Sequence, residues 1–200
     1  HSKNIDPIKG FELVALKLED AINYEIKSKN LNAISMVLVD DQKIAWAKGF
    51  GYEDPKRKIK ADANTVYRVG SVSKLFTDMA IMQRVEKGEI DLDEPIQTYL
   101  PNFNPLNTYK TPITLRQMMS NRSGLLREPR KGNYFTDDEI SLKATVESII
   151  PSKLIHEPES KTKYSNAAIA VAGYTLEVLY QTPYVKYMQK HILEKIGMNN

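Results

Sequence analysis

The chain has 200 residues, of which 42% are hydrophobic and 26% are charged. This is the composition of a globular protein, and it excludes a chain that is disordered, collagen-like or coiled-coil throughout. The 28 basic and 25 acidic residues give a net charge of +3, with the two signs interspersed. Nucleic-acid-binding proteins concentrate positive charge on one surface, so we expect no nucleic-acid partner.

The residue types that are absent narrow the chemistry further. Without cysteine the chain has no disulfide framework, no thiolate zinc site and no cysteine nucleophile. The histidines His1, His156 and His191 are not spaced as a metal-binding pair, and His156 is expected at the surface. No apolar run approaches the roughly 18 residues of a membrane-spanning helix. The sequence therefore predicts neither a metal site nor a membrane span.

The first seventy residues predict a helix and a β-hairpin. Apolar residues recur on one helical face between Phe11 and Lys27. Two apolar runs, 34–39 and 43–50, flank a short polar turn, as in a hairpin. Residues 54–63 are polar and are expected to form a loop.

From Ser71 onward the chain is predicted to be mostly helical. The first of these helices ends near Gly88, and its apolar stripe consists of Leu75, Met79, Met82 and Val85. Further helices are expected at 114–119, 137–149, 165–179 and 184–196. This order favours an α+β fold over alternating βαβ units. We expect two parts, residues 1–70 with the helix and hairpin and residues 71–200 with the helix that begins near Ser71 and the helical segments after it.

The tetrapeptide Ser71-Val72-Ser73-Lys74 is the most informative candidate for a catalytic centre. A serine and a lysine three residues apart on a helix lie on one face. A helix N-terminus favours developing negative charge, and a nearby amine with a lowered pKa can accept the hydroxyl proton. Ser71 is therefore a candidate nucleophile with Lys74 as its base. The alternative is a capping serine beside a solvated lysine.

Two further patterns bear on this interpretation. The same spacing recurs at Ser160-Lys161-Thr162-Lys163, but no amphipathic helix follows it, and we interpret this copy as chance. Tyr164-Ser165-Asn166 is a second candidate, since a tyrosine near lysines can lose or share its proton and Asn166 offers an amide donor and acceptor. On these residues alone, a half-buried packing tyrosine stays an alternative.

Together these motifs resemble those of the serine β-lactamase and penicillin-binding protein superfamily. Ser-x-x-Lys at 71–74 precedes Tyr-x-Asn at 164–166, and the surrounding segments resemble the branch of class C β-lactamases, D-aminopeptidases and esterases. These segments are 67–77, 87–95 with 99–101, 114–125 and 192–198. The resemblance spans about residues 34–200 in the expected order.

The resemblance implies a β-lactamase/transpeptidase-like fold, with an antiparallel sheet flanked by helices and a mostly helical subdomain. It implies that Ser71 attacks an ester, amide or β-lactam carbonyl to form an acyl-enzyme, with its backbone N–H as one oxyanion donor. Lys74 and Tyr164 would share the proton transfers, and Asn166 would position the substrate. No cofactor or metal is implied, and a periplasmic or secreted protein is expected.

The sequence departs from the family pattern at three places. Asn121 stands where relatives usually have histidine, and Glu159 follows proline where relatives usually have glycine. A third motif, Lys or His followed by any residue and glycine on a strand of the site, is missing, because Lys195-Ile196-Gly197 belongs to a segment already matched. We therefore expect a C-terminal remainder of the same protein to complete the sheet and the site.

Three functions are compatible with the sequence. A broad esterase or peptidase-like hydrolase is favoured over a dedicated β-lactamase, and a penicillin-binding sensor or structural module, acylated without turnover, is the alternative. Deacylation distinguishes the hydrolase from the sensor, because a hydrolase releases its acyl group whereas a sensor holds it. The third, a noncatalytic relative, is disfavoured because Ser71, Lys74 and Tyr164 are all present. The loop from Arg127 to Phe135 is expected to shape the substrate pocket.

Overall fold

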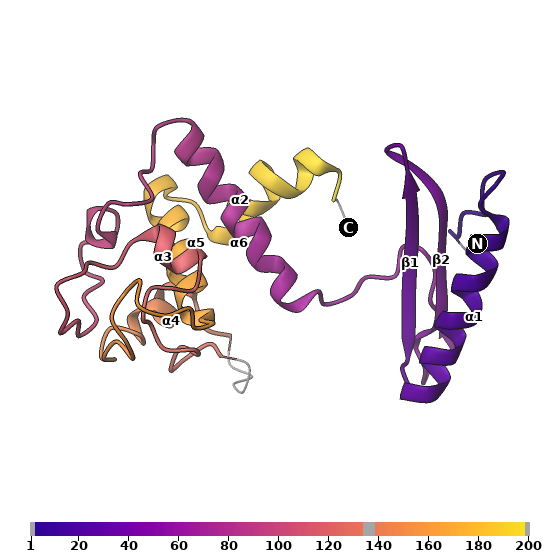
Figure 1. The fold of residues 1–200 in the computed structure, drawn as a ribbon, viewed down its shortest axis with the longest axis horizontal. Coiled ribbons are helices and arrows are strands. Elements are labelled where there is room, and N and C mark those ends of the chain that lie inside the picture. The colour runs from indigo at the N-terminus through magenta and orange to yellow at the C-terminus, as the bar shows by residue number, and fades with distance from the viewer. Residues whose placement is uncertain (1–2, 134–138, 199–200) are drawn as a thin grey trace. The chain divides into compact units, whose positions relative to one another are not determined.

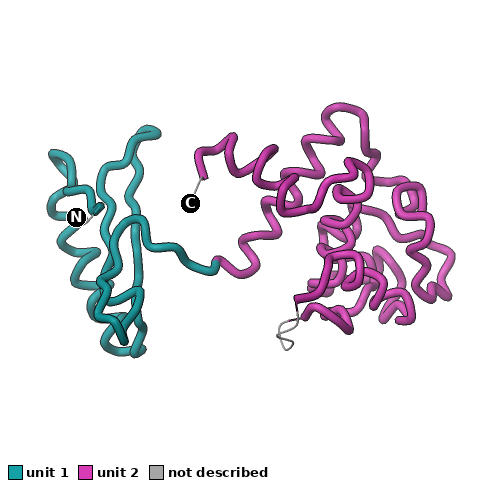
Figure 2. Tube along the Cα trace, turned by 180° about the vertical axis from the view of Figure 1, so that it is seen from behind, with its two compact units in different colours: residues 1–68 teal, residues 69–200 magenta. Residues whose placement is uncertain are grey.

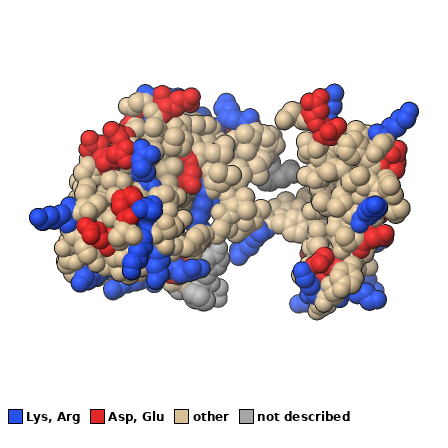
Figure 3. All heavy atoms as spheres, in the orientation of Figure 1, with Lys and Arg blue, Asp and Glu red and all other residues tan. Residues whose placement is uncertain are grey.

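The computed structural model of the protein describes residues 3–133 and 139–198 (Figure 1). It divides into two compact units, residues 1–68 and 69–200 (Figure 2). The division falls two residues before the boundary expected from the sequence. On the face drawn in Figure 3, acidic and basic side chains are interspersed within each unit. No described helix is long and apolar enough to cross a membrane.

The first unit is a helix packed on a small antiparallel sheet. Helix α1 spans Glu12–Lys29 and ends where Asn30 adopts the left-handed conformation, a common helix stop. Strands β1, Ala33–Asp40, and β2, Lys43–Asp54, form the predicted hairpin. Its two-residue turn has positive φ at both central residues, which matches the right-handed twist of the strands.

The sheet has a third strand that the sequence did not predict. Strand β3, Ile59–Lys60, lies within the segment expected to be a loop, and it pairs with β2 so that the sheet order is β1-β2-β3. A two-residue strand is too short to show a period-2 pattern. The core of this unit lies between α1 and one face of the hairpin, where Trp46 and Phe50 are buried.

The second unit is built around one buried helix. Helix α5, Asn166–Tyr180, buries mostly small side chains, which allow neighbouring helices to approach closely. The helices that contact it are α2, Ser73–Glu86; α3, Leu115–Met119; α4, Leu142–Glu147; and α6, Tyr184–Met188. Helix α6 continues as a π turn, Gln189–Leu193, and a 3-10 turn, Glu194–Ile196. Two further 3-10 turns are Gly70–Val72 and Ile96–Thr98.

Helix α2 buries a face that differs in part from the predicted one. Leu75, Met79 and Met82 of the predicted stripe are 59%, 37% and 45% exposed, whereas the buried residues are Thr77, Ala80, Ile81 and Arg84. Ala80 is small enough for close approach to the core. The guanidinium of Arg84 lies 4.6 Å from the Tyr180 ring centroid, so a charged residue replaces a hydrophobic one on the core side. Val85 of the predicted stripe, with the flanking Phe76 and Ile81, does pack on the core, so apolarity alone indicated the buried face only in part.

Helix α4 is shorter than the predicted helix over 137–149, of which residues 137–138 lie outside the described part of the chain. The Ser141 hydroxyl accepts a hydrogen bond from the Ala144 N–H at 3.2 Å and so caps the helix start. His156, expected at the surface, is buried, and its Nδ1 lies 2.8 Å from the Glu157 carbonyl oxygen.

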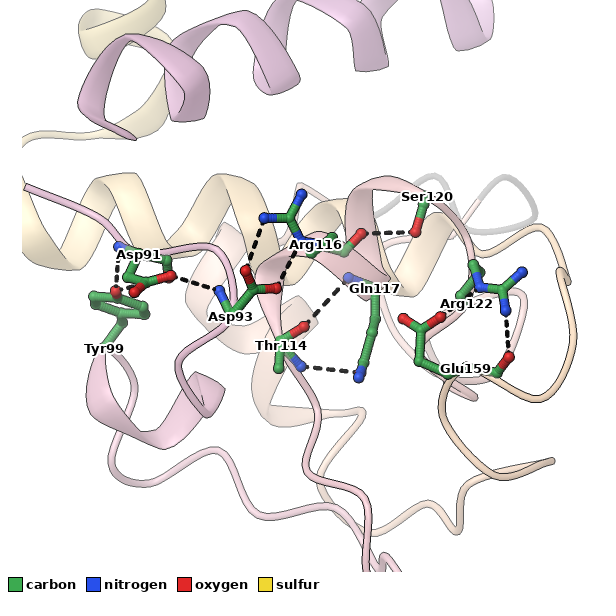
Figure 4. A network of polar contacts seen from close by, with 9 residues as sticks. All are labelled: Asp91, Asp93, Tyr99, Thr114, Arg116, Gln117, Ser120, Arg122 and Glu159. Carbon is green, nitrogen blue, oxygen red and sulfur yellow. Dashed lines mark hydrogen bonds and ion pairs between the residues drawn. The ribbon is translucent and has the colours of Figure 1, made fainter. Parts of the chain in front are cut away.

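Polar contacts fix the short helix α3 (Figure 4). Thr114 and Gln117 form a reciprocal capping box, which satisfies N–H groups at the helix start. Both ends of the Arg116 guanidinium bond the Asp93 carboxylate, at 2.6 and 2.8 Å, and this holds the pKa of Asp93 below its ordinary value. A five-residue helix is unstable alone, so these contacts set its position.

Gly124 has two reasons to be glycine. Its φ is +76°, and a Cβ there would lie 2.2 Å from the carbonyl oxygen of His156. The main chains are close because the Ile155 N–H donates to the Gly124 carbonyl at 2.8 Å. A side chain at this position would push these two segments apart.

We predict that Gly124→Ala lowers the free energy of unfolding by more than about 2 kcal/mol, through backbone strain and the clash. Gly88→Ala is the matched control, because Gly88 also has positive φ (+71°), but no described atom lies within 4 Å of the position that a Cβ would occupy there. It should cost only about 1 kcal/mol. Urea unfolding of both variants measures the difference, and equal losses would show that the clash is relieved.

Candidate active site

Two of the residues predicted from the motifs, Lys74 and Tyr164, both bond the side-chain oxygen of a third, Ser71. Ser71 lies in the 3-10 turn that precedes α2, and Lys74 lies in the first turn of α2. The Lys74 Nζ donates to the Ser71 Oγ at 3.1 Å. The Tyr164 hydroxyl also donates to the Ser71 Oγ. A serine hydroxyl with an amine and a phenol on its oxygen has both groups within reach of its proton.

The surroundings of Tyr164 favour its ionised form. The pKa of Tyr164 is lowered chiefly by its hydrogen bond with Lys74, then by that with Ser71, and further by the charges of Lys74 and Arg127. The Lys74 Nζ lies 4.7 Å, and the Arg127 Cζ 5.2 Å, from the Tyr164 ring centroid. Two cations beside one phenol increase the fraction that is ionised, and only the ionised phenol can accept a proton.

The turn that carries Tyr164 is held by Asn121. Asn121 has a φ of +59° and ends α3 in a Schellman pattern, in which the N–H of Arg122 bonds the Gln117 carbonyl. Its carbonyl accepts from the Lys163 N–H at 2.7 Å, and its Oδ1 accepts from the Ser165 N–H at 2.9 Å. The residue that departs from the family pattern therefore fixes the backbone on both sides of Tyr164.

The second departure, Glu159, also adopts a left-handed conformation, with a φ of +69°. Glycine, usual in relatives, adopts this conformation without strain. Here Arg122 compensates: its Nε donates to the Glu159 carboxylate at 2.7 Å, and its carbonyl accepts from the Glu159 N–H at 2.9 Å (Figure 4). An ion pair thus holds a backbone conformation that glycine would adopt freely.

Asn166, the fourth predicted site residue, forms hydrogen bonds with two consecutive residues of this chain, Arg127 and Glu128. Its Nδ2 donates to the Glu128 Oε1 at 2.7 Å, and its backbone N–H donates to the Arg127 carbonyl at 2.7 Å. Within the described ranges no hydrogen bond joins Asn166 to Ser71. Arg127 and Glu128 therefore contact the tyrosine and the asparagine of the Tyr-x-Asn motif, respectively. Their adjacency to this motif in space could not be read from a sequence separation of nearly forty residues.

The other sequence candidates lie outside this group of contacts. The Ser160 hydroxyl donates to the Glu157 carbonyl at 2.6 Å. Ser160 lies outside any helix, whereas Ser71 and Lys74 lie in a 3-10 turn and in α2. The Lys195-Ile196-Gly197 segment lies in and after a 3-10 turn and not on a strand. No three His, Asp or Glu side chains of the described residues are gathered to hold a metal ion. The part of the 127–135 loop at residues 134–135 lies outside the described residues.

An unpaired carboxyl group lies one helical turn beyond Lys74. The Asp78 Oδ1 is buried, and no hydrogen-bond donor reaches it in the described part of the chain. Burial raises the pKa of Asp78 to about 6, although the charge of Lys74 opposes this rise. No local pattern signals this environment, because an aspartate on an amphipathic helix is ordinarily solvated.

Comparison with known proteins identifies the fold family. The sequence profile of the family described as Beta-lactamase matches residues 18–200. This chain belongs to the beta-lactamase family. Beta-lactamase-like protein 2 of Dictyostelium discoideum is 32% identical over 92% of this chain. The chain spans only 35–37% of the length of the curated relatives that it matches.

Solved structures that are similar to this chain have the same fold. The octameric penicillin-binding protein homologue from Pyrococcus abyssi superposes with a TM-score of 0.80 at 26% identity, over 92% of this chain and 43% of that one. EstCE1, a hydrolase with promiscuous acyltransferase activity, gives 0.82 at 23% identity, over 92% of this chain and 51% of that one. The beta-lactamase/transpeptidase-like α+β fold expected from the sequence is thus confirmed.

We predict that Arg127→Gln raises the pKa of Tyr164, because it removes one of the two cations beside the phenol. A titration followed by NMR of ¹³Cζ-labelled tyrosine, with Tyr164→Phe to assign the signal, measures this. Arg130→Gln is the matched control, since Arg130 bonds the Pro151 carbonyl instead. An equal effect of both variants would rule out a local charge effect.

We also predict a pH-dependent effect of Asp78→Asn. Since the folded-state pKa of Asp78, about 6, exceeds the ordinary value of 3.8, its favourable contribution to stability is complete below pH 3.8 and is lost as pH rises through 6. Asp78→Asn should therefore match the parent at pH 3.5 and exceed it by about 1–2 kcal/mol at pH 8, after allowance for partial solvent exposure. Urea unfolding at both pH values tests this. A pH-independent difference would contradict it.

Proposed function

We propose that this chain carries the nucleophile of a serine hydrolase, which forms an acyl-enzyme on Ser71 from an ester, amide or β-lactam substrate. The observation that carries the proposal is the convergence of the Lys74 amine and the Tyr164 phenol on the Ser71 Oγ. The lowered pKa of Tyr164 adds to it, because a base must accept the hydroxyl proton during attack. Membership of the beta-lactamase family, whose solved relatives include a hydrolase, is consistent with this chemistry.

In the proposed reaction Tyr164 acts in its ionised form. The Ser71 Oγ bonds to the carbonyl carbon while its proton passes to the Tyr164 phenolate, and the Lys74 charge stabilises that phenolate beforehand. The carbonyl oxygen becomes an oxyanion, for which the Ser71 backbone N–H is one donor. Collapse of the intermediate breaks the bond to the leaving group, which takes the proton. Water then attacks the acyl-enzyme with the same base and releases the acid. Asn166 positions the substrate through its amide.

We further propose that a C-terminal remainder of the protein completes the site. Val72 and Leu75 at the start of α2 are 57% and 59% exposed, and Val37 and Val39 on β1 are 53% and 56% exposed. Apolar surface of this kind favours a covering element. In each unit, a further segment of the intact protein would cover these apolar residues. In the second unit that segment would also supply the second oxyanion donor. The family resemblance also leads us to propose a periplasmic or secreted protein.

Intact mass spectrometry with a fluorophosphonate probe tests the nucleophile. The protein should gain a single adduct, and Ser71→Ala should gain none. Ser160→Ala is the matched control, because Ser160 has the same spacing to a lysine, at Lys163, without the contacts of the candidate site. It should be labelled as fast as the parent. Labelling of Ser71→Ala would refute the assignment.

The same measurement tests whether the C-terminal remainder is needed for the site. It also tests the alternative function, in which the protein is acylated without turnover. If the 200-residue chain is unlabelled but the intact protein is labelled at Ser71, the remainder completes the site; if neither is labelled, the hydrolase proposal fails. With an ester or a β-lactam in place of the probe, loss of the adduct with time indicates a hydrolase. A persistent adduct would instead indicate a sensor.

A further inference from the structure

Asp78 lies on the same side of α2 as Lys74 and the candidate nucleophile. It follows Lys74 by four residues, and Lys74 follows Ser71 by three, so the three side chains lie along one side of this helix and the turn before it. Side chains on a helix tilt toward its N-terminus, which places the Asp78 carboxyl over the turn that carries Lys74. The charge of Lys74 acts on this carboxyl and lowers its pKa, against the larger rise that burial causes.

The Asp78 carboxyl has an oxygen that its surroundings leave unpaired. Its Oδ1 is covered, and none of the described residues donates a hydrogen bond to it. On α6, the Tyr184 hydroxyl interacts electrostatically with Asp78, but it lies 2.6 Å from the Thr77 Oγ1 and pairs with that hydroxyl instead. A buried carboxylate without a partner is costly, so an ionised Asp78 would gain strongly from a cation.

The elements that pack on α2 leave Lys74 as the cation that acts on Asp78 within the described ranges. On the π turn that follows α6, His191 interacts with Arg84 farther along α2. The residues of α5 that lie beside Lys74 are uncharged; they are Ile169, Ala170 and Gly173. The electrostatic partner of an ionised Asp78 is therefore a residue of the candidate site.

The Lys74 ammonium has the capacity to bond Asp78. An ammonium carries three N–H donors, and those of Lys74 bond the Ser71 Oγ at 3.1 Å and the Tyr164 phenol. The four-carbon stem of lysine is flexible, and residues four apart on a helix are within reach of each other. A carboxylate is a stronger acceptor than a neutral hydroxyl, so a charged Asp78 competes with Ser71 for this ammonium.

We propose that Asp78 is a positioning residue, which in its ionised form competes with Ser71 and Tyr164 for the Lys74 ammonium. The inference rests on the proposed hydrolase function. While Asp78 is neutral, Lys74 stays on Ser71 and stabilises the Tyr164 phenolate that accepts the hydroxyl proton. When Asp78 is charged, it attracts the ammonium along α2 and offsets part of its charge, which disfavours the phenolate. Asp78 thus acts on the reaction through Lys74, without touching the substrate.

The test measures the pKa of Tyr164 in the intact protein, by NMR of ¹³Cζ-labelled tyrosine. Asp78→Asn keeps the shape of the side chain but removes its charge, so the pKa of Tyr164 should fall. Lys74→Met and the double variant complete a mutant cycle. Because Asp78 acts through Lys74, Asp78→Asn should lose most of its effect on Tyr164 once residue 74 is methionine. Glu86→Gln, which neutralises an exposed carboxylate at the end of the same helix, is the matched control and should leave the pKa of Tyr164 unchanged.

A second measurement follows the reaction itself. The rate at which the fluorophosphonate labels Ser71 should rise with pH as Tyr164 ionises. In Asp78→Asn the midpoint of this rise should shift to lower pH by the same amount as the pKa of Tyr164. Asp78→Glu restores a carboxylate and should return the midpoint toward that of the parent. A purely structural role would lower the rate at every pH and leave the midpoint in place, and a thermal melt of each variant verifies folding.

The outcomes separate this inference from the function on which it rests. If Ser71 is labelled but Asp78→Asn does not lower the pKa of Tyr164, the role of Asp78 is wrong and the hydrolase proposal stands. The same holds if Asp78→Asn lowers this pKa equally with lysine and with methionine at position 74, because the effect then bypasses Lys74. If the intact parent is not labelled at all, the hydrolase proposal fails, and the role of Asp78 in the reaction fails with it.

Discussion

The geometry of the site depends on two hydrogen bonds that Asn121 accepts from the backbone at Lys163 and Ser165. Tyr164 lies between these two residues, so the two bonds hold the backbone from which its phenol reaches Ser71. The same turn starts α5, because the Ser165 hydroxyl accepts from the Ala168 N–H at 2.9 Å. The most buried helix of the second unit and the candidate base are therefore placed by one short segment.

Charge is arranged asymmetrically around the Tyr-x-Asn motif. Lys74 and Arg127 flank the ring of Tyr164, whereas Asn166 faces the carboxylate of Glu128. A phenol beside cations ionises more readily, and an amide whose Nδ2 is held by a carboxylate keeps a fixed orientation with its oxygen free for other donors. The consecutive residues Arg127 and Glu128 thus give opposite environments to two side chains that are two residues apart.

The sequence predicted the local elements better than their packing. The hairpin, the helix after Ser71 and the start of α5 follow from periodicity, turn residues and caps, which are local signals. Strand β3 was not predicted because two residues are too few to show the period-2 pattern of a strand. The buried face of α2 was predicted only in part, because Arg84 is stabilised by Tyr180 and Tyr187, which are distant in the sequence. The contacts of Arg127, Glu128 and Asp78 likewise depend on residues that no local pattern encodes. Ser71, Lys74 and Tyr164 were candidates from short local motifs, and the family resemblance strengthened that interpretation.

The short length of α3 has a consequence for how this segment can vary. Thr114 and Gln117 fix the start of the helix, and the Schellman pattern at Asn121 fixes its end, so the number of residues between them sets the direction of the Asn121 side chain. Each added or removed residue would turn that side chain by about 100° around the helix axis. A change in the length of α3 by one residue would therefore detach Tyr164 from its support.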